Sequence, residues 1–355
     1  MTGQSMTLTK CPHAILDQRS RLARPGFRRL VSYALLAGVL GATAFFVSRN
    51  LDGAAAYVRD VSAADLLLLI LAGALTVMTV LIFGLVWGGI LQRLAGTESG
   101  IDFRYLRAFA YSWPGRYLPG TLPYHAARVL MAGQLGTTKR VVAASIGYET
   151  VLQLSSAALV GVICLTLALG SSAGAGPVYV VPALLIVPLP VLLRPGILQP
   201  LSGWALKRVG RQPLDRAFFL STGENLRVFM AYCFGHGLNG LGFFLVARAL
   251  LGPSEISLPL AVAALNLAGV LGVLAFFVPS GIGVREGVIV ALLSGSLAPE
   301  TALLVAGTAR AVSIVADVLP FLLLAAFELT QRLLRYTRSR AQRTAAVSLV
   351  GRRRA

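Results

Sequence analysis

Arginine and histidine occur in a proline- and glycine-rich break within apolar sequence, WPGRYLPGTLPYHAARVLMAGQLG, residues 113–136. Arg116 and Gly120 lie in the first part of this segment, and His125 and Arg128 lie in the second. A guanidinium group presents a planar fork of N–H donors that matches the oxygens of a phosphate or carboxylate. The chemistry that this segment predicts is therefore the binding of an anion.

A second break of the same kind, FFVPSGIGVREGVIVALL, spans residues 276–293. Gly281 and Gly283 interrupt the apolar run, and Arg285 and Glu286 follow as neighbouring opposite charges. Each of the two segments thus has an apolar approach, a Pro/Gly interruption, and a new helix with arginine in its first turns. The alternative is an ordinary loop between two spans, in which the arginine is an anchor paired with the glutamate.

Proline and glycine have a physical consequence at these breaks. Proline removes a backbone donor and glycine relaxes the dihedral restriction, so both unwind a helix. Unpaired backbone groups at membrane depth are tolerated only inside protein or beside water. Each break also leaves a half-helix N-terminus whose partial positive charge can hold an anion beside a nearby arginine. Because broken helices in corresponding halves mark substrate sites in membrane proteins, the two segments predict one pocket for an anionic headgroup.

Three further ionisable side chains interrupt apolar runs: Glu149 in SIGYETVLQLSS, and Arg310 and Asp317 in TARAVSIVADVLPF. An ionisable group at mid-membrane costs about 2.5–3.5 kcal/mol on insertion scales, so it normally faces the bundle interior and a partner. Arg310 and Asp317 are two helical turns apart and share a helix face. We expect all three to line the same pocket. The alternative for Asp317 is an ion pair that only orders the bundle, and for Glu149 a position near the cytoplasmic interface.

The elements that must position these residues are membrane-spanning helices. Of the 355 residues, 56% are hydrophobic and 13% are charged, whereas soluble domains are about 25% charged. Crossing about 30 Å of hydrocarbon takes roughly 20 apolar residues. The sequence predicts an all-α, polytopic bundle of about eight spans with two broken, re-entrant segments, of which the first covers 103–132. The expected spans are 30–48, 66–91, 140–170, 177–193, 228–251, 258–278, 284–297 and 301–330, and 284–297 is short enough to be half of a re-entrant hairpin.

The basic residues, which give a formal charge of +18, gather in alternate loops. Segments 1–29, 93–140, 194–227 and the tail from Arg332 carry six, seven, six and eight basic residues, against one, two, two and no acidic ones. By the positive-inside rule, these segments and both termini are expected in the cytoplasm. The expected divisions are a basic cytoplasmic segment (1–29), a transmembrane domain (30–331) and a basic, disordered cytoplasmic tail (332–355).

No cofactor and no metal are expected. Cys11, Cys164 and Cys233 are scattered, and the sequence has no zinc-ligand spacing, HExxH or phosphate loop. The basic residues lie at membrane edges, so they predict contact with anionic lipid headgroups and not with nucleic acid. His236 and Asn239 lie among glycines at helix-packing spacing, which indicates close helix contact, and the alternative is a proton relay through the histidine.

The two broken segments resemble those of the lysylphosphatidylglycerol synthase transmembrane family, also called flippase-like domain proteins. YLPGTLPYHAARVLMAGQLG is similar to a Pro-Gly, Arg-containing segment of that family, and VPSGIGVREG is similar to its signature close to PGGxGxxE. The Glu of GYET occupies the place of a family Glu-Arg pair, and TARAVS matches a late helix that bears Arg. The resemblance covers roughly residues 30–330 and implies the family's membrane fold.

Departures from the family pattern concern the headgroup preference. Thr150 stands where Arg is expected, Ser280 stands in place of a Gly, and Pro123-Tyr124 stands where many relatives have Gly-Glu. We expect the chain to lack the soluble domain that transfers an aminoacyl group to phosphatidylglycerol in the bifunctional members. For a membrane unit alone, the resemblance implies translocation of a lipid or polyprenyl phosphate, or assistance to a lipid-modifying enzyme.

Together, these patterns predict a multi-pass protein of the cytoplasmic membrane that binds and translocates an anionic lipid, with a phospholipid or polyprenyl-phosphate-linked headgroup. The expected partners are anionic membrane lipids and, as a further hypothesis, a separately encoded lipid-modifying enzyme. We expect no enzymatic activity. The alternative is a membrane transferase, or an accessory subunit of one, that acts on a lipid-linked donor. Its base would be Glu149, Glu286 or Asp317.

Overall fold

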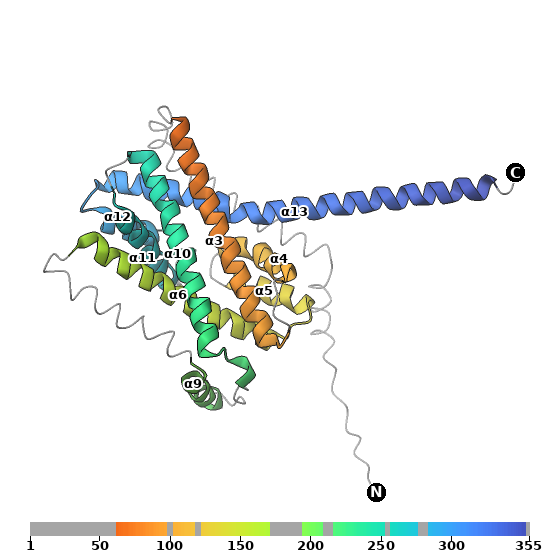
Figure 1. The fold of residues 1–355 in the computed structure, drawn as a ribbon, viewed down its shortest axis with the longest axis horizontal. Coiled ribbons are helices and arrows are strands. Elements are labelled where there is room, and N and C mark those ends of the chain that lie inside the picture. Colours follow the sequence, from red (N-terminus) through yellow and green to blue (C-terminus); the bar gives the residue numbers. More distant parts are fainter. Residues whose placement is uncertain are drawn as a thin grey trace, which may run out of the picture.

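The computed structural model describes residues 62–97, 102–117, 122–170, 194–208, 216–252, 256–275 and 283–352. Within these ranges the chain forms nine α-helices and two short 3-10 helices and no strand (Figure 1). The all-α fold predicted from the sequence is therefore confirmed. The expected spans 30–48 and 177–193, and the segment 1–29, lie outside the described residues.

Helices α3 (Ala63–Ala95) and α10 (Thr222–Leu251) lie side by side (Figure 1). Each begins with a serine whose hydroxyl accepts from the backbone N–H three residues on, and an acidic side chain at that position bonds back. Nε of Arg93, near the end of α3, lies 2.5 Å from Oε1 of Glu224 in the first turn of α10. The end of α3 and the start of α10 are therefore on one side of the bundle, and the helices are antiparallel.

Helices α6 (Lys139–Leu169) and α11 (Leu258–Leu274) pack against each other and against α10. In the second half of α3, Nε1 of Trp87 donates a hydrogen bond to Oγ of Ser145, in the first half of α6, at 3.2 Å. Helix α6 therefore begins on the side where α3 ends.

Glycines allow α10 to approach its neighbours closely. A Cβ atom on Gly235 would lie 2.4 Å from Cε1 of Phe83 in α3, and one on Gly240 would lie 2.9 Å from the Cα of Val262 in α11. Between them, Nε2 of His236 lies 3.0 Å from a backbone carbonyl oxygen of α6. This glycine-rich stretch is a helix-packing surface, as its spacing predicted, and the histidine side chain takes part in it.

Gly240→Ala is expected to destabilise the protein by about 1–3 kcal/mol, because the new Cβ overlaps a backbone atom that cannot rotate away. The measurement is the melting temperature in detergent. Gly237→Ala is the matched control on the same helix, since no atom lies within 4 Å of the place that its new Cβ would take. Higher helix propensity should leave that variant unchanged or stabilise it by about 0.5–1 kcal/mol. Equal melting of the two variants would contradict close packing at Gly240.

The first broken segment forms α4 (Phe103–Ser112), the 3-10 helix η1 (Trp113–Tyr117) and α5 (Leu122–Gln134). Because α3 ends and α6 begins on the same side, this segment enters the bundle and returns to that side as a re-entrant hairpin. Asp102 caps α4, and the guanidinium of Arg104, 2.8 Å away, holds the pKa of that carboxyl below its ordinary value.

The second broken segment enters from the other side. Helix α12 (Val284–Leu293) has 10 residues, so it is about 15 Å long and too short to cross a bilayer. Its last residue, Leu293, packs in one hydrophobic cluster with Val246 from the end of α10 and Leu260 from the start of α11. Helices α11 and α12 are therefore two arms of a hairpin that is opposed to the first, which agrees with the short segment predicted at 284–297.

Helix α13 (Pro299–Arg352) crosses the bundle and extends away from it (Figure 1). Residues 332–352, which the sequence analysis assigned to a disordered tail, continue this helix. The physical reason is that residues 321–350 contain no proline or glycine and are rich in Ala, Leu, Arg and Gln, which are good helix formers. The segment 194–227, predicted as a polar loop, also contains helical structure, namely α9 (Pro195–Arg208) and the 3-10 helix η2 (Arg216–Phe218).

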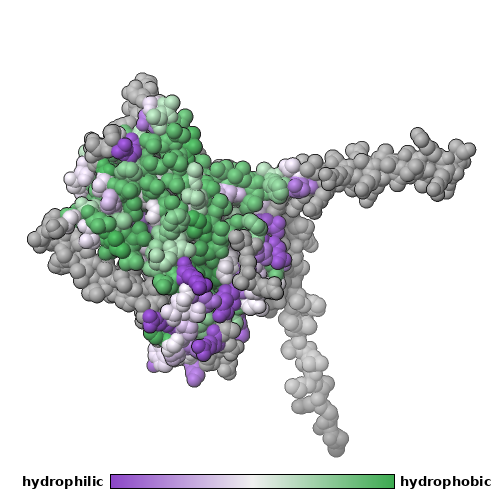
Figure 2. Space-filling view, viewed as in Figure 1, coloured by the Kyte–Doolittle hydropathy of each residue, from purple (hydrophilic) through white to green (hydrophobic). Residues whose placement is uncertain are grey.

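Four of the described helices are long and apolar enough to cross a membrane: α3, α6, α10 and the first 33 residues of α13. They correspond to the predicted spans 66–91, 140–170, 228–251 and 301–330. Large apolar side chains on their outer faces are exposed, such as Leu67 at 64% and Phe327 at 62%. Figure 2 shows this apolar surface in green, with hydrophilic residues gathered toward one end. A continuous apolar surface of this kind fits contact with lipid and not with water.

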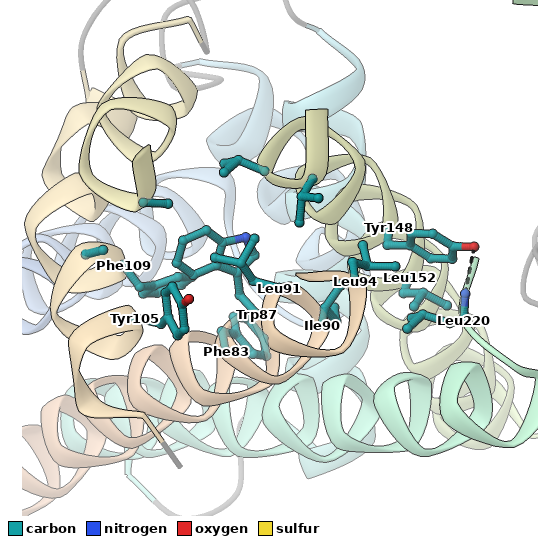
Figure 3. Packing of buried hydrophobic residues seen from close by; sticks show 14 of the residues in the cluster. Phe83, Trp87, Ile90, Leu91, Leu94, Tyr105, Phe109, Tyr148, Leu152 and Leu220 are labelled. Atoms are coloured by element: carbon teal, nitrogen blue, oxygen red, sulfur yellow. Dashed lines mark hydrogen bonds between the residues drawn. The ribbon is translucent and has the colours of Figure 1, made fainter. Parts of the chain in front are cut away.

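A large hydrophobic core lies beside the first hairpin. Trp87 from α3 packs there with Tyr105 and Phe109 from α4 (Figure 3). In the same cluster the hydroxyl of Tyr148 accepts a hydrogen bond from the backbone N–H of Leu220 at 3.1 Å, drawn as a dashed line in Figure 3. This bond ties the first half of α6 to the residues just before α10. The core therefore gives the first hairpin a fixed wall to pack against.

Candidate functional site

The side chain of Arg128, on α5, is fully buried, with 0% of it exposed. Its guanidinium carbon lies 4.7 Å from the ring centroid of Trp87, 4.3 Å from that of Phe109 and 4.2 Å from that of Tyr124. The face of an aromatic ring attracts a cation. Because arginine does not lose its proton in proteins, a permanent positive charge lies inside the bundle in an aromatic box.

Polar groups complete the surroundings of this guanidinium. One of its nitrogens donates to Oε2 of Glu149 on α6, a second donates to the hydroxyl of Tyr124, and Nε donates to Oγ of Ser112 at 3.4 Å. The side chain of Glu149 is 3% exposed. Either charge buried alone would be strongly destabilising, whereas the pair offsets part of the desolvation cost. The structure thus brings together Arg128 and Glu149, two of the residues predicted for the site.

A second group of charges lies where η1 meets α13. The hydroxyl of Tyr117 donates to Oδ2 of Asp317, and Nη1 of Arg116 lies 3.8 Å from the same oxygen. The guanidinium carbon of Arg310 lies 5.5 Å from the ring centroid of Tyr117. Arg310 and Asp317 are both buried. As their spacing predicted, they share a face of α13, and this face is turned to the first hairpin.

Arg285 brings the second hairpin to the same place. It is the second residue of α12, and it interacts electrostatically with Arg310 and Arg116, which have the same charge, and with Glu286, which has the opposite charge. Among the described residues it forms no ion pair and no hydrogen bond through its side chain. Arg285 is therefore a cation held near other cations, and its guanidinium donors remain available for an anion.

Glu286, the neighbour of Arg285, has a structural role that the sequence analysis did not predict. Its Oε2 accepts a hydrogen bond from the backbone N–H of Gly283 at 2.7 Å, so the carboxylate caps its own helix. Gly283 has a φ of 84°, a left-handed conformation that glycine adopts readily. This bond uses one of the two carboxylate oxygens and fixes the start of α12.

We use the name arginine cluster for Arg116, Arg128, Arg285, Arg310, Glu149 and Asp317. Arg116 connects its parts, because it interacts electrostatically with both Asp317 and Glu149. The cluster holds four positive and two negative charges, or three negative charges if the capping Glu286 is included. The two hairpins enter from opposite sides and meet here, which is the arrangement that forms substrate sites in many transporters.

Among the other predicted residues, His125 interacts electrostatically with Arg128. His125 lies beside Tyr124 on α5, with their ring centroids 4.9 Å apart. Its Nδ1 is buried and has no hydrogen-bond partner among the described residues. Gly283 is exposed and shapes the start of α12. Gly120 and Gly281 lie outside the part of the chain that the structure describes.

The sequence analysis missed the aromatic residues of the site. Tyr117 follows the first arginine of the broken segment directly, and Tyr124 precedes Arg128 by four residues, a spacing at which helix side chains meet. These two spacings were signals that could have been used. Trp87 and Phe109 gave no such signal, because they reach the guanidinium from other helices.

A polytopic α-helical membrane protein with two opposed hairpins around buried arginines is the class that this fold and site define. Residues 30–320 match a family model described as Lysylphosphatidylglycerol synthase TM region. The chain therefore belongs to this family, which confirms the resemblance seen in the broken segments and connects the protein to lipid handling in membranes. Among the curated proteins, no sequence matches the chain significantly.

Proposed function

We propose that the protein binds an anionic lipid headgroup at the arginine cluster and translocates it across the cytoplasmic membrane. The observation that carries this proposal is that Arg285 interacts electrostatically with Arg116 and Arg310, so that one buried and two partly buried arginines from three separate elements act on one another. Like charges repel strongly where water is scarce, so an anion that bridges them stabilises this arrangement. The phosphate of a phospholipid or of a polyprenyl-phosphate-linked lipid has the charge and the oxygens for this role.

The opposed hairpins supply a route for the headgroup. One hairpin comes from the side where α3 ends, and the other comes from the side where α10 ends, so each can open toward one leaflet. The headgroup would exchange sides as the two halves rock, while the acyl chains stay in lipid along the exposed apolar surface. Translocation by this route needs no soluble domain.

The proposed orientation has both termini in the cytoplasm. The contact between Arg93 and Glu224 supports it, because this contact places the start of the basic segment 93–140 and the end of the basic segment 194–227 on one side of the bundle. Together with the spans 30–48 and 177–193 that the sequence predicts, the four long apolar helices would make six crossings, an even number that returns the chain to its starting side. The positive-inside rule then assigns that side to the cytoplasm.

The alternative function, a membrane transferase or its accessory subunit, requires a positioned base. Glu149 is bound to Arg128, Asp317 accepts from Tyr117, and Glu286 caps its own helix. All three candidate bases thus already accept hydrogen bonds from the protein, which favours binding over catalysis.

Vesicles that contain the purified protein test the proposal. Phosphatidylglycerol with a fluorescent acyl chain should change leaflets faster than in protein-free vesicles, and faster than labelled phosphatidylcholine, because only the first carries a net negative charge. The label in the outer leaflet is quenched with dithionite, and the molecular mass of the recovered lipid is measured by mass spectrometry. Unchanged mass is expected. Covalently altered lipid would support the transferase, and rates equal to those of protein-free vesicles would contradict translocation.

A further inference from the structure

Glu149 uses only one of its carboxylate oxygens in the structure. Oε2 accepts from Arg128, whereas Oε1 is buried and accepts no hydrogen bond from any residue that the structure describes. The hydroxyl of Tyr232, on α10, is buried in the same way and interacts electrostatically with Glu149. A buried polar atom without a partner costs free energy. Binding of a headgroup at the other arginines does not explain why this oxygen lies there.

The charge of Arg128 limits how many anions can lie beside its guanidinium. A guanidinium that is fully buried needs an anion at all times, and Glu149 supplies one. If a headgroup phosphate approached Arg128, two anions would face this one guanidinium in a medium where charges interact strongly. A proton on Oε1 removes the conflict, because neutral Glu149 can release the guanidinium to the phosphate.

We propose that Glu149 is a proton-binding site coupled to the headgroup site, an inference that rests on the proposed function. As an anionic headgroup binds, an O–H bond forms at Oε1 with a proton taken from water on one side of the membrane, and the carboxylate loses its charge. When the headgroup leaves, this O–H bond breaks, the proton passes to water on the other side, and the pair with Arg128 re-forms. A proton gradient is then the energy source for lipid movement.

The surroundings of Glu149 favour its carboxyl group as the site that binds the proton, over another side chain or a bound metal ion. Among the described residues, α11 has no titratable side chain, and those of α3, Asp65 and Arg93, lie at the ends of that helix. A calcium ion would need about 6–8 oxygen ligands, whereas among the described residues near Glu149 only its carboxylate and the hydroxyl of Tyr232 have atoms without partners. The titratable groups that interact with Glu149 are Arg128 and Tyr124 from α5, Arg116 from η1, and Tyr232 from α10.

Proton uptake on lipid binding is the test. Dihexanoylphosphatidylglycerol is added to the detergent-solubilised wild-type protein in weakly buffered, mildly acidic solution that contains a pH indicator, and bound lipid is counted in parallel. About one proton should be taken up per bound lipid, and none with uncharged dihexanoylglycerol. Glu149→Gln keeps the size of the side chain but cannot take up a proton, so the number of protons taken up per bound lipid should fall to about zero, whatever amount of lipid the variant binds.

Each outcome decides between the two proposals. Lipid binding without proton uptake by the wild-type protein would overturn proton coupling and leave the headgroup site standing. Proton uptake that persists in Glu149→Gln would place the proton elsewhere and also overturn it. No lipid binding by the wild-type protein would remove the headgroup site and, with it, this inference. If Glu149→Gln does not fold, Glu149→Leu together with Arg128→Leu takes its place, and proton uptake that persists in this double variant overturns the assignment to Glu149.

Discussion

Arg128→Leu is expected to destabilise the protein by about 3–5 kcal/mol, because it leaves Glu149 as a buried charge without its partner. The change also removes the cation from the aromatic box of Trp87, Phe109 and Tyr124. Both losses act on the folded state, since the unfolded chain can solvate its charges. The measurement is the melting temperature of the purified protein in detergent.

A double variant separates the charge effect from lost packing. Arg128→Leu with Glu149→Leu removes both charges, so it should be more stable than Arg128→Leu alone. Arg104→Leu is the control, because this arginine is 68% exposed and pairs with Asp102 at the surface, and no measurable change is expected. If Arg128→Leu melts like this control, the buried ion pair is not a major source of stability.

Arg285→Gln is expected to lower the amount of anionic lipid retained by the protein by at least roughly tenfold, which corresponds to about 1.4 kcal/mol. Its side chain forms no ion pair with another described residue, and it lies near Arg116 and Arg310, which have the same charge. Removing its charge therefore takes away attraction for an anion and also relieves repulsion within the protein. Retained lipid is measured by mass spectrometry after gentle purification.

The stability of this variant is as informative as its lipid content. A residue held in place for binding can be replaced without loss of stability, so the melting temperature of Arg285→Gln should equal or exceed that of the wild-type protein. Arg227→Gln is the matched control, since Arg227 is exposed on α10, outside the arginine cluster. A variant that retains lipid but melts at a lower temperature would show that Arg285 is structural.

The pattern of apolar runs was sufficient to predict the helices of this fold. Length and hydropathy located α3, α6, α10 and α13, because a bilayer requires long apolar helices whatever their partners are. The Pro/Gly breaks likewise marked both hairpins, since these residues act on their own backbone. The continued helix at 332–352 was missed because a basic composition fits a disordered tail as well as an exposed helix, and only helix propensity separates them.

The site was predictable in its residues but not in its pairings. Charges in apolar sequence pointed to Arg128, Glu149, Arg310 and Asp317, because a charge that is buried in a membrane protein without a partner is costly in free energy. Which of them bind each other depends on how helices pack, and a sequence does not carry that directly. Glu286 shows the limit most clearly, since a glutamate at the third position of a helix can serve as a cap as well as a ligand.

The most direct test of the headgroup site is mass spectrometry of the lipids retained by gently purified wild-type protein and by Arg285→Gln, side by side. We expect the wild-type protein to retain an anionic lipid in about equimolar amount and the variant to lose most of it while staying folded. Retention of the same lipids in the same amounts by both proteins would contradict the proposal that the arginine cluster binds an anionic headgroup.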